Sequence, residues 1–358
     1  MNHKREITYF AAIHEATDFC LKTDPKVFLI GLGVPDPKGI FGTTIGLQKK
    51  YGPERVMDMP VSENGLTGIC IGAALRGLRP ILTHQRVDFS LLSLDQIINN
   101  AAKWYYMFGG LLKVPLVIRM VIGCGWGQGA QHSQSLQALF AHIPGLKVVM
   151  PTTPYDAKGM LISAVQDNNP VIFLEHRWLH GLKDVVPEES YTVPIGQAKR
   201  LKEGHQLTLV ASSYMTIESL KAAKILEQEG IQIDLIDLRT VRPFDQELIF
   251  QSVKKTGHLL VVDSGWITGG LAGEIIAQVT EHQYAALKAA PQRLALPDIP
   301  TPSSPALTKD FYPGYRQIIE KILIMLCCQP KEIQAVLKKI KDDGKPHDVP
   351  DLSFTGPF

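Results

Sequence analysis

A glutamate stands at the junction between a strand and a helix that the sequence predicts. Glu63 follows a strand-like run at 55–60 and precedes a segment rich in glycine and alanine at 64–77. Because α/β sheets bind ligands at the carboxyl ends of their strands, Glu63 is a candidate ligand-binding carboxylate. Ser62 and Glu63 could instead only begin the helix, since serine caps helices well and carboxylates favour the first helical turn. The residues alone leave both interpretations open.

A histidine follows a loop that is unusually rich in glycine. Glycines at 123, 125, 127 and 129 lead to His132, and a helix is predicted at 133–142. Glycine lets backbone approach a ligand closely, and a histidine in such a place can exchange a proton near neutral pH. A lone histidine more often has a structural role, so that alternative also stays open.

The elements that must position these residues alternate between strand and helix in the first half of the chain. Strand-like apolar runs lie at 27–31, 55–60, 79–84, 114–120, 147–151 and 170–175. Helical spacing of apolar residues lies at 7–21, 64–77, 91–107, 133–142 and 154–167. This alternation predicts a parallel sheet with helices on both faces.

A second cycle of the same kind follows a polar stretch at 181–205, which contains Pro187 and Pro194 and is typical of an interdomain connection. Strands are predicted at 207–212, 231–238, 258–263 and 293–296, with helices at 216–229, at 245–255 and from 270. We therefore expect an α/β protein with two domains, at 1–185 and 200–325, each a mostly parallel sheet flanked by helices. A C-terminal helix and extended tail are expected at 326–358.

Length and composition agree with a soluble two-domain enzyme. A chain of 358 residues exceeds the size at which one hydrophobic core stops growing. A formal charge of only +2 gives no reason to expect nucleic acid or a membrane surface as a partner. The five cysteines form no Cys-x-x-Cys spacing, and no signal peptide or transmembrane run is evident, so we expect a cytoplasmic protein.

Several motifs, in this order, resemble one family over about residues 5 to 325. They are Pro60-Val61-Ser62-Glu63, Asp95-Gln96-Ile97-Ile98-Asn99, Gln131-His132-Ser133-Gln134-Ser135, Ile236-Asp237-Leu238-Arg239, and Val261-Val262-Asp263-Ser264-Gly265-Trp266. The sequence resembles the beta subunit of thiamine-diphosphate-dependent 2-oxo acid dehydrogenases, the component that decarboxylates pyruvate or branched-chain oxo acids. The resemblance implies a transketolase-type pyrimidine-binding domain followed by a transketolase-type C-terminal domain.

The resemblance also implies roles for four side chains. Glu63 would hydrogen-bond the aminopyrimidine ring of thiamine diphosphate and promote the tautomer that activates the thiazolium carbon. This requires a carboxyl group that shares a proton with a ring nitrogen in a dry site. Phe89 would pack against the pyrimidine and Gln96 would belong to the same cofactor site. His132 would lie close to the reacting carbon, where it could transfer a proton or orient the acyl group.

Two metal ions follow from the same resemblance. Related chains bind potassium through backbone carbonyls, a ligand type that suits a hard cation. By motif the potassium site would fall on Leu116, Ala164, Val165, Asp167 and Asn169. Family members hold magnesium and the diphosphate with a Gly-Asp-Gly segment followed by paired asparagines, and this sequence has no Gly-Asp-Gly. We therefore expect an alpha subunit that holds Mg²⁺, in a heterotetramer of two alpha and two beta chains.

Substrate and acceptor stay open at this stage. An ordinary dehydrogenase would decarboxylate a 2-oxo acid and pass the acyl group to the lipoyl group of an acyltransferase. A carboligase or transketolase-like subunit would pass it to an aldehyde or sugar-like acceptor, and a non-catalytic paralogue would not be expected to retain Glu63 and His132. The sequence departs from the common family pattern at 31–34 and at 82–86. Four cationic or polar side chains could meet an anionic substrate, or could equally lie in a solvated loop or a subunit contact: His84, Arg86, His176 and Arg177.

Overall fold

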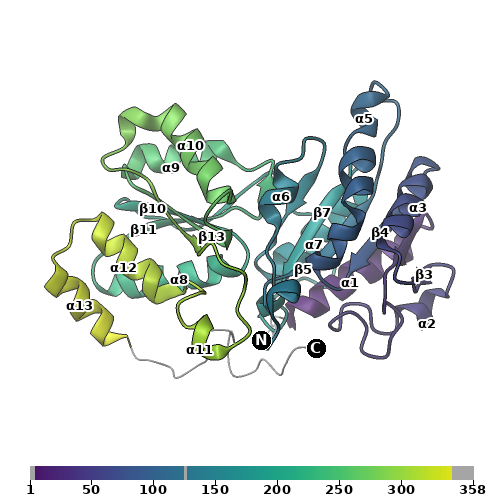
Figure 1. Cartoon of the computed structure of the whole chain (residues 1–358), viewed down its shortest axis with the longest axis horizontal. Helices are drawn as coiled ribbons and strands as arrows, with labels where there is room; N and C mark the ends of the chain where they lie inside the picture. Colours follow the sequence, from purple (N-terminus) through teal and green to yellow (C-terminus); the bar gives the residue numbers. More distant parts are fainter. Residues whose placement is uncertain (1–4, 125–126, 341–358) are drawn as a thin grey trace.

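The computed structural model describes residues 5–124 and 127–340, which build two lobes that lie side by side (Figure 1). The first lobe is centred on a seven-stranded sheet whose strands are parallel except for β12 at one edge. Its strands are buried apolar runs, as expected for a sheet covered by helices on both faces. In sheet order they are β12 (Thr240–Arg242), β6 (Lys147–Val149), β7 (Val171–His176), β5 (Val117–Ile122), β4 (Arg79–His84), β2 (Val27–Ile30) and β3 (Val56–Met57).

The helices of the first lobe form its outer layers, and α1 packs closely against α7. Thr153 caps α7 by accepting the backbone N–H of Asp156, and Pro154 occupies the first turn, where its missing donor costs nothing. The helices are α1 (Tyr9–Thr23), α2 (Leu47–Tyr51), α3 (Glu63–Leu75), α4 (Val87–Ser90), a π-helix (Gln96–Ala101), α5 (Trp104–Met107), α6 (Gln137–Ala141) and α7 (Pro154–Gln166). Short 3₁₀ turns lie at Leu91–Ser93, Ala130–His132 and Arg177–Leu179.

The second lobe contains a five-stranded sheet with one antiparallel edge strand, β9. In sheet order its strands are β14 (Gln292–Leu296), β13 (Leu259–Trp266), β10 (Leu207–Ala211), β11 (Ile233–Asp237) and β9 (Lys199–Lys202). Its helices are α8 (Tyr214–Gln228), α9 (Gln246–Thr256), α10 (Leu271–Gln283), α11 (Pro305–Thr308), α12 (Tyr315–Met325) and α13 (Pro330–Lys339), with a 3₁₀ turn at Tyr284–Ala286. Two α/β lobes with mostly parallel sheets confirm the predicted fold class.

Four predicted elements differ from the structure, and one of them is the helix predicted at 91–107, which is divided into the 3₁₀ turn Leu91–Ser93, the π-helix Gln96–Ala101 and α5. The helix predicted at 133–142 is only α6, from Gln137, because the hydroxyl of Ser133 donates to Gln128 O and Gln134 O accepts the N–H of Gly123. The strand predicted at 55–60 is only β3, since the Asp58 carboxylate accepts the N–H of Gly33 and of Met59. The connection predicted at 181–205 contains β8 (Lys183–Val185), which pairs with β1 (Glu6–Thr8), and β9.

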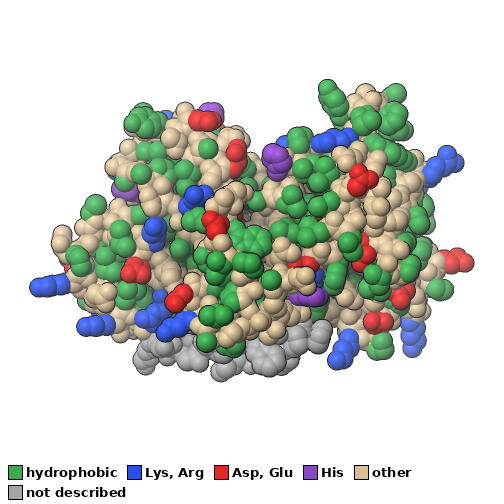
Figure 2. Space-filling view, viewed as in Figure 1, with side chains coloured by type: hydrophobic (Ala, Val, Ile, Leu, Met, Phe, Trp, Pro, Cys, Tyr) green, Lys and Arg blue, Asp and Glu red, His purple; other side chains and the backbone are tan. Residues whose placement is uncertain are grey.

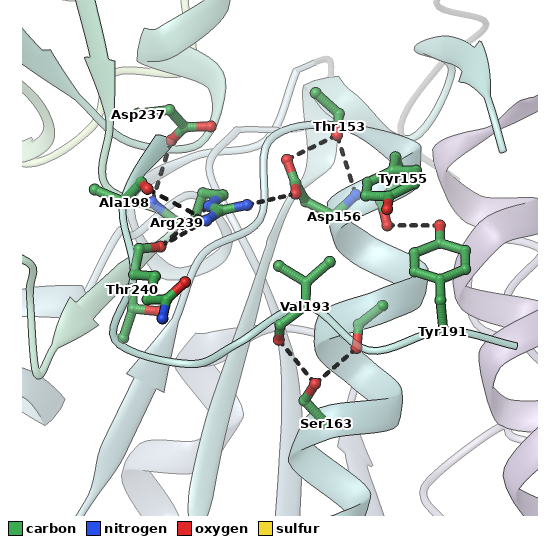
Figure 3. Close-up of polar contacts among 12 residues, drawn as sticks. Thr153, Tyr155, Asp156, Ser163, Tyr191, Val193, Ala198, Asp237, Arg239 and Thr240 are labelled. Atoms are coloured by element: carbon green, nitrogen blue, oxygen red, sulfur yellow. Dashed lines mark hydrogen bonds and ion pairs between the residues drawn. The ribbon is translucent and has the colours of Figure 1, made fainter. Parts of the chain in front are cut away.

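The two lobes are joined by β12, which leaves the second lobe and pairs antiparallel with β6 in the first sheet. At the same junction, Arg239 donates to the buried carboxylate of Asp156 and to the carbonyls of Gln197 and Ala198 (Figure 3). Nearby, the Ser163 hydroxyl donates to Val193 O, which fastens the connecting segment onto α7. The lobes are therefore held together by backbone pairing as well as by side chains.

The predicted tail at 326–358 is described only as far as residue 340, where it includes α13, and residues 341–358 lie outside the described residues. Among the described helices, none has the length and apolar character that crossing a lipid bilayer would require.

Candidate active site

Glu63 is the first residue of α3 and lies beyond the carboxyl end of β3. Its side chain is buried, with only 5% of the residue exposed, even though it carries an ionisable group. Within residues 5–124 and 127–340, no group donates a hydrogen bond to this carboxylate. A buried carboxylate normally has a partner, so its position suits a ligand that offers a ring nitrogen or an amino group.

Phe89 and His132 come together although they are far apart in sequence. Phe89 lies in α4, after β4, and His132 ends the 3₁₀ turn after β5, so both follow the carboxyl ends of adjacent strands. Their rings meet edge to face, with centroids 5.6 Å apart. His132 is exposed and Phe89 is half-buried, so this pair forms part of an accessible surface. The helix that the sequence predicts directly after His132 does not begin there, and His132 instead ends the 3₁₀ turn that closes the glycine loop.

Gln96 begins the π-helix and faces α3. Its side-chain oxygen accepts from Asn100 and lies where a side chain at Gly68 would contact it. Gly68 is five residues beyond Glu63 on α3, so Gln96 packs beside the helix that carries the buried carboxylate.

Comparisons with known proteins assign this arrangement to a family. Residues 5–181 match the transketolase pyrimidine-binding domain and residues 196–318 match the transketolase C-terminal domain. The chain is 43% identical over 324 residues to the beta subunit of acetoin:2,6-dichlorophenolindophenol oxidoreductase of Cupriavidus necator, covering 88% of this chain and 96% of that protein. This chain is a thiamine-diphosphate-dependent 2-oxo acid dehydrogenase beta subunit.

Other relatives of this beta subunit agree. It is 43% identical to the mitochondrial pyruvate dehydrogenase E1 component subunit beta of Bos taurus and 42% identical to that of Homo sapiens, in each case over 88% of this chain and 89% of the relative. A solved structure titled split gene transketolase, inactive beta4 tetramer, matches 90% of this chain and 99% of its own with a TM-score of 0.75. At 24% identity that likeness supports the fold alone.

The beta subunit buries three of the four cationic or polar side chains that could have met an anionic substrate. His84, Arg86 and His176 are each at most 4% exposed and Arg177 is half-buried, so the interpretation as a solvated loop is wrong. Burial lowers the pKa of His84 to about 4 and that of His176 to about 3, and both imidazoles are therefore neutral at pH 7. Burial also lowers the pKa of Arg86, and burial with repulsion by Arg86 lowers the pKa of Arg177 to about 10.

The residues predicted to bind potassium lie at the amino ends of β5 and β7, whereas Glu63 lies beyond the carboxyl end of β3. Leu116 precedes β5, and the other four surround the turn between α7 and β7. Arg79 donates to Val165 O at 2.8 Å and to Asp167 O at 2.9 Å, and Leu116 O accepts from Val171 N. These carbonyls therefore belong to a structural region, distant along the strands from Phe89 and His132.

Two residues near His132 were not singled out as functional from the sequence. The side-chain amide of Gln134 donates to the Asp88 carboxylate at 2.7 Å, which links the end of the glycine loop to α4. Asp88 directly precedes Phe89, and Gln134 follows His132 by two residues within a quoted motif, but only the fold brings Asp88 and Gln134 into contact. Their closeness in sequence to Phe89 and His132 was the only feature that could have indicated a role in the site.

Proposed function

We propose that Glu63, Phe89 and Gln96 form the aminopyrimidine half of a thiamine diphosphate site. The observation that carries this proposal is the buried Glu63 carboxylate, which has no donor among the residues that the structure describes. Glu63 would share a proton with a ring nitrogen, and Phe89 would offer an aromatic surface to the ring. Gln96, beside α3, would line the same region.

The proposed cofactor would supply a nucleophilic carbon that attacks the oxo group of the substrate. This chain would contribute binding and proton control around that carbon. His132 is exposed on a loop and carries an imidazole, a group that can take up or release a proton, so it would position or protonate the acyl group before transfer. Phe89 would fix the orientation of the imidazole through the edge-to-face contact.

An alpha subunit would complete the site and hold Mg²⁺ and the diphosphate, because this sequence lacks a Gly-Asp-Gly segment. An exposed apolar surface on the first lobe supports this proposal. Apolar side chains are exposed around α3 and at the projecting end of the lobe that carries α5 (Figure 2). A soluble chain rarely leaves such a surface uncovered. The most exposed of these side chains are Val61 (72%), Ile69 (61%), Leu92 (62%), Tyr106 (87%), Met107 (63%) and Leu111 (86%).

For the complete enzyme we propose decarboxylation of a pyruvate-like 2-oxo acid and transfer of the acyl group to a lipoyl carrier on an acyltransferase. The printed names of the pyruvate dehydrogenase relatives support the first step. The name of the Cupriavidus necator relative favours a second candidate, in which acetoin takes the place of the 2-oxo acid as the compound that is oxidised. An assay with each substrate in turn separates the two.

Potassium remains a proposal for the turn between α7 and β7. Val165 O and Asp167 O each accept one hydrogen bond from Arg79, which leaves a second lone pair on each oxygen for a cation. If potassium binds there, KCl should raise the Tm of the full chain more than an equal concentration of NaCl. For the compartment we propose a reducing one such as the cytoplasm, which the five free cysteines support.

The deciding experiment is co-expression with the alpha chain of the same organism. The purified complex should reduce an artificial electron acceptor with a 2-oxo acid, and Glu63→Gln should abolish that activity without dissociating the complex. Glu54→Gln, at an exposed position before β3, is the matched control and should retain activity. An active complex containing Glu63→Gln would refute the assigned site.

A further inference from the structure

The two ends of the glycine loop are attached to one corner of the first lobe. That corner comprises residues 86–89, where β4 passes into α4. Arg86 Nη1 donates to the carbonyl of Gly123, at the start of the loop, at 2.6 Å. Asp88 Oδ1 accepts from the side-chain amide of Gln134, just beyond His132, at 2.7 Å.

The two ends of the loop also bond to each other. The backbone N–H of Gly123 donates to Gln134 O at 3.1 Å, so Arg86, Gly123, Gln134 and Asp88 form a continuous chain of contacts. Gly123 has a φ of +78°, and a Cβ there would lie 2.6 Å from His176 Nε2. Only glycine fits, because the backbone is left-handed and the buried imidazole fills the space beneath it.

The cost of burying Arg86 suggests that it has a specific role. Only 2% of the residue is exposed, its Nη2 has no hydrogen-bond partner in the described part of the chain, and Arg177 repels it. A buried guanidinium costs free energy unless it is paired and fully bonded. A neutral donor would satisfy Gly123 O at lower cost, but it would not supply the positive charge of Arg86. Burial raises the pKa of the Asp88 carboxylate, and the hydrogen bond from Gln134 and the charge of Arg86 lower it.

We propose that Arg86 and Asp88 are positioning residues that clamp both ends of the glycine loop and thereby hold His132 against Phe89. The glycines in the described part of the loop, Gly123, Gly127 and Gly129, restrict the backbone little, so the position of His132 depends on the contacts that the ends of the loop make. This inference rests on the proposed function in one respect, since a held His132 matters to catalysis only if His132 acts on the substrate. The clamp itself is a statement about the loop and can be tested without activity.

Hydrogen–deuterium exchange on the full chain tests the clamp directly. Arg86→Met should make the amides of 127–134 exchange about tenfold faster, the order expected when one hydrogen bond to a charged donor is lost. Arg86→Lys should recover part of the protection, because an ammonium group can still reach a carbonyl. Gln134→Leu removes the bond at the other end of the clamp and leaves the buried charge of Arg86 in place. It should accelerate exchange of the same amides, and it keeps the test available if Arg86→Met does not fold.

Arg55→Met is the matched control. Arg55 also donates to backbone carbonyls, those of Leu21, Asp24 and Val27, but far from the glycine loop. Its loss should leave the exchange of 127–134 unchanged. Wild-type protection of 127–134 in both Arg86→Met and Gln134→Leu would overturn the proposal.

A double-mutant cycle in the complex with the alpha chain tests the catalytic consequence. If Arg86 acts only through His132, Arg86→Met should lower acceptor-dependent turnover about tenfold or more, but should cause no further loss in a His132→Ala background. Additive losses would show that Arg86 acts independently of His132 and would overturn its assignment. Loosened exchange together with a catalytically silent His132→Ala would uphold the clamp and refute only the proposed role of His132.

Discussion

The ring of Phe89 meets the ring of His132 edge to face, 5.6 Å between centroids, although 43 positions separate the two residues (132 − 89). Each ring follows the carboxyl end of its own strand, β4 for Phe89 and β5 for His132, and those strands are neighbours in the sheet. The sheet therefore brings together an aromatic surface and a group that can exchange a proton. Glu63 likewise follows the carboxyl end of a strand of this sheet, β3.

His132→Ala should impair transfer of the acyl group more than it impairs the initial decarboxylation. General acid–base groups typically contribute about a hundredfold or more, so the difference should exceed assay error. Single-turnover decarboxylation and acceptor-dependent turnover should be measured on the same assembled preparation. His142→Ala, an exposed histidine on another face, is the control. Equal losses in both half-reactions would indicate that His132 has only a structural role.

Glu63→Gln should leave folding and association with the alpha chain nearly intact, because the replacement is isosteric. Decarboxylation should fall by about a hundredfold or more, since an amide cannot share a proton with a ring nitrogen as a carboxyl group does. Exchange of the thiazolium proton for deuterium, followed by NMR in the assembled complex, reports on this step alone. Unchanged exchange in the variant would remove Glu63 from its assigned role.

The isolated chain should bind thiamine diphosphate weakly or not at all, because it offers contacts for the pyrimidine but no Gly-Asp-Gly segment for the metal and diphosphate. Isothermal titration calorimetry with and without Mg²⁺ measures this, with the assembled complex as the positive control. Tight, magnesium-dependent binding by the homogeneous chain would contradict the need for an alpha subunit.

Asp237→Asn should change how stability depends on pH. Burial, and then repulsion by Asp156, raise the pKa of Asp237 from 3.8 to about 7 in the folded protein. The folded state thus keeps a proton that the unfolded state releases, so the contribution to stability is full below about pH 4 and is lost as pH rises through about 7. The variant has no such proton, so the Tm of the variant minus the Tm of the wild type should increase by a few degrees from pH 5 to pH 8.

Differential scanning calorimetry of the full chain at several pH values measures that gain. Asp310→Asn, which changes an exposed carboxylate, serves as the control and should follow the wild type. A Tm difference for Asp237→Asn that stays constant from pH 5 to pH 8 would contradict the assignment.

The sequence by itself determined the order of the elements and the position of Glu63 between a strand and a helix. Apolar periodicity is a local property, since burial on one face of a helix or both faces of a strand repeats every few residues. The same local rules misplaced the start of α6, because Gln134 O bonds to Gly123 rather than within a helix. Helix ends depend on such competing partners, which local periodicity does not register.

Only the tertiary structure decided which distant residues meet. It placed β12 in the first sheet, buried Arg86 beneath the glycine loop, and set Arg239 against Asp156 across the two lobes. These contacts join residues that lie between 37 and 94 positions apart in the sequence, and no local pattern encodes such pairings. Whether a charged side chain is buried depends on what the neighbouring elements place around it. From the sequence alone, His84, Arg86, His176 and Arg177 could therefore lie in solvent, face a substrate or contact another subunit. Only the folded sheet shows what surrounds them.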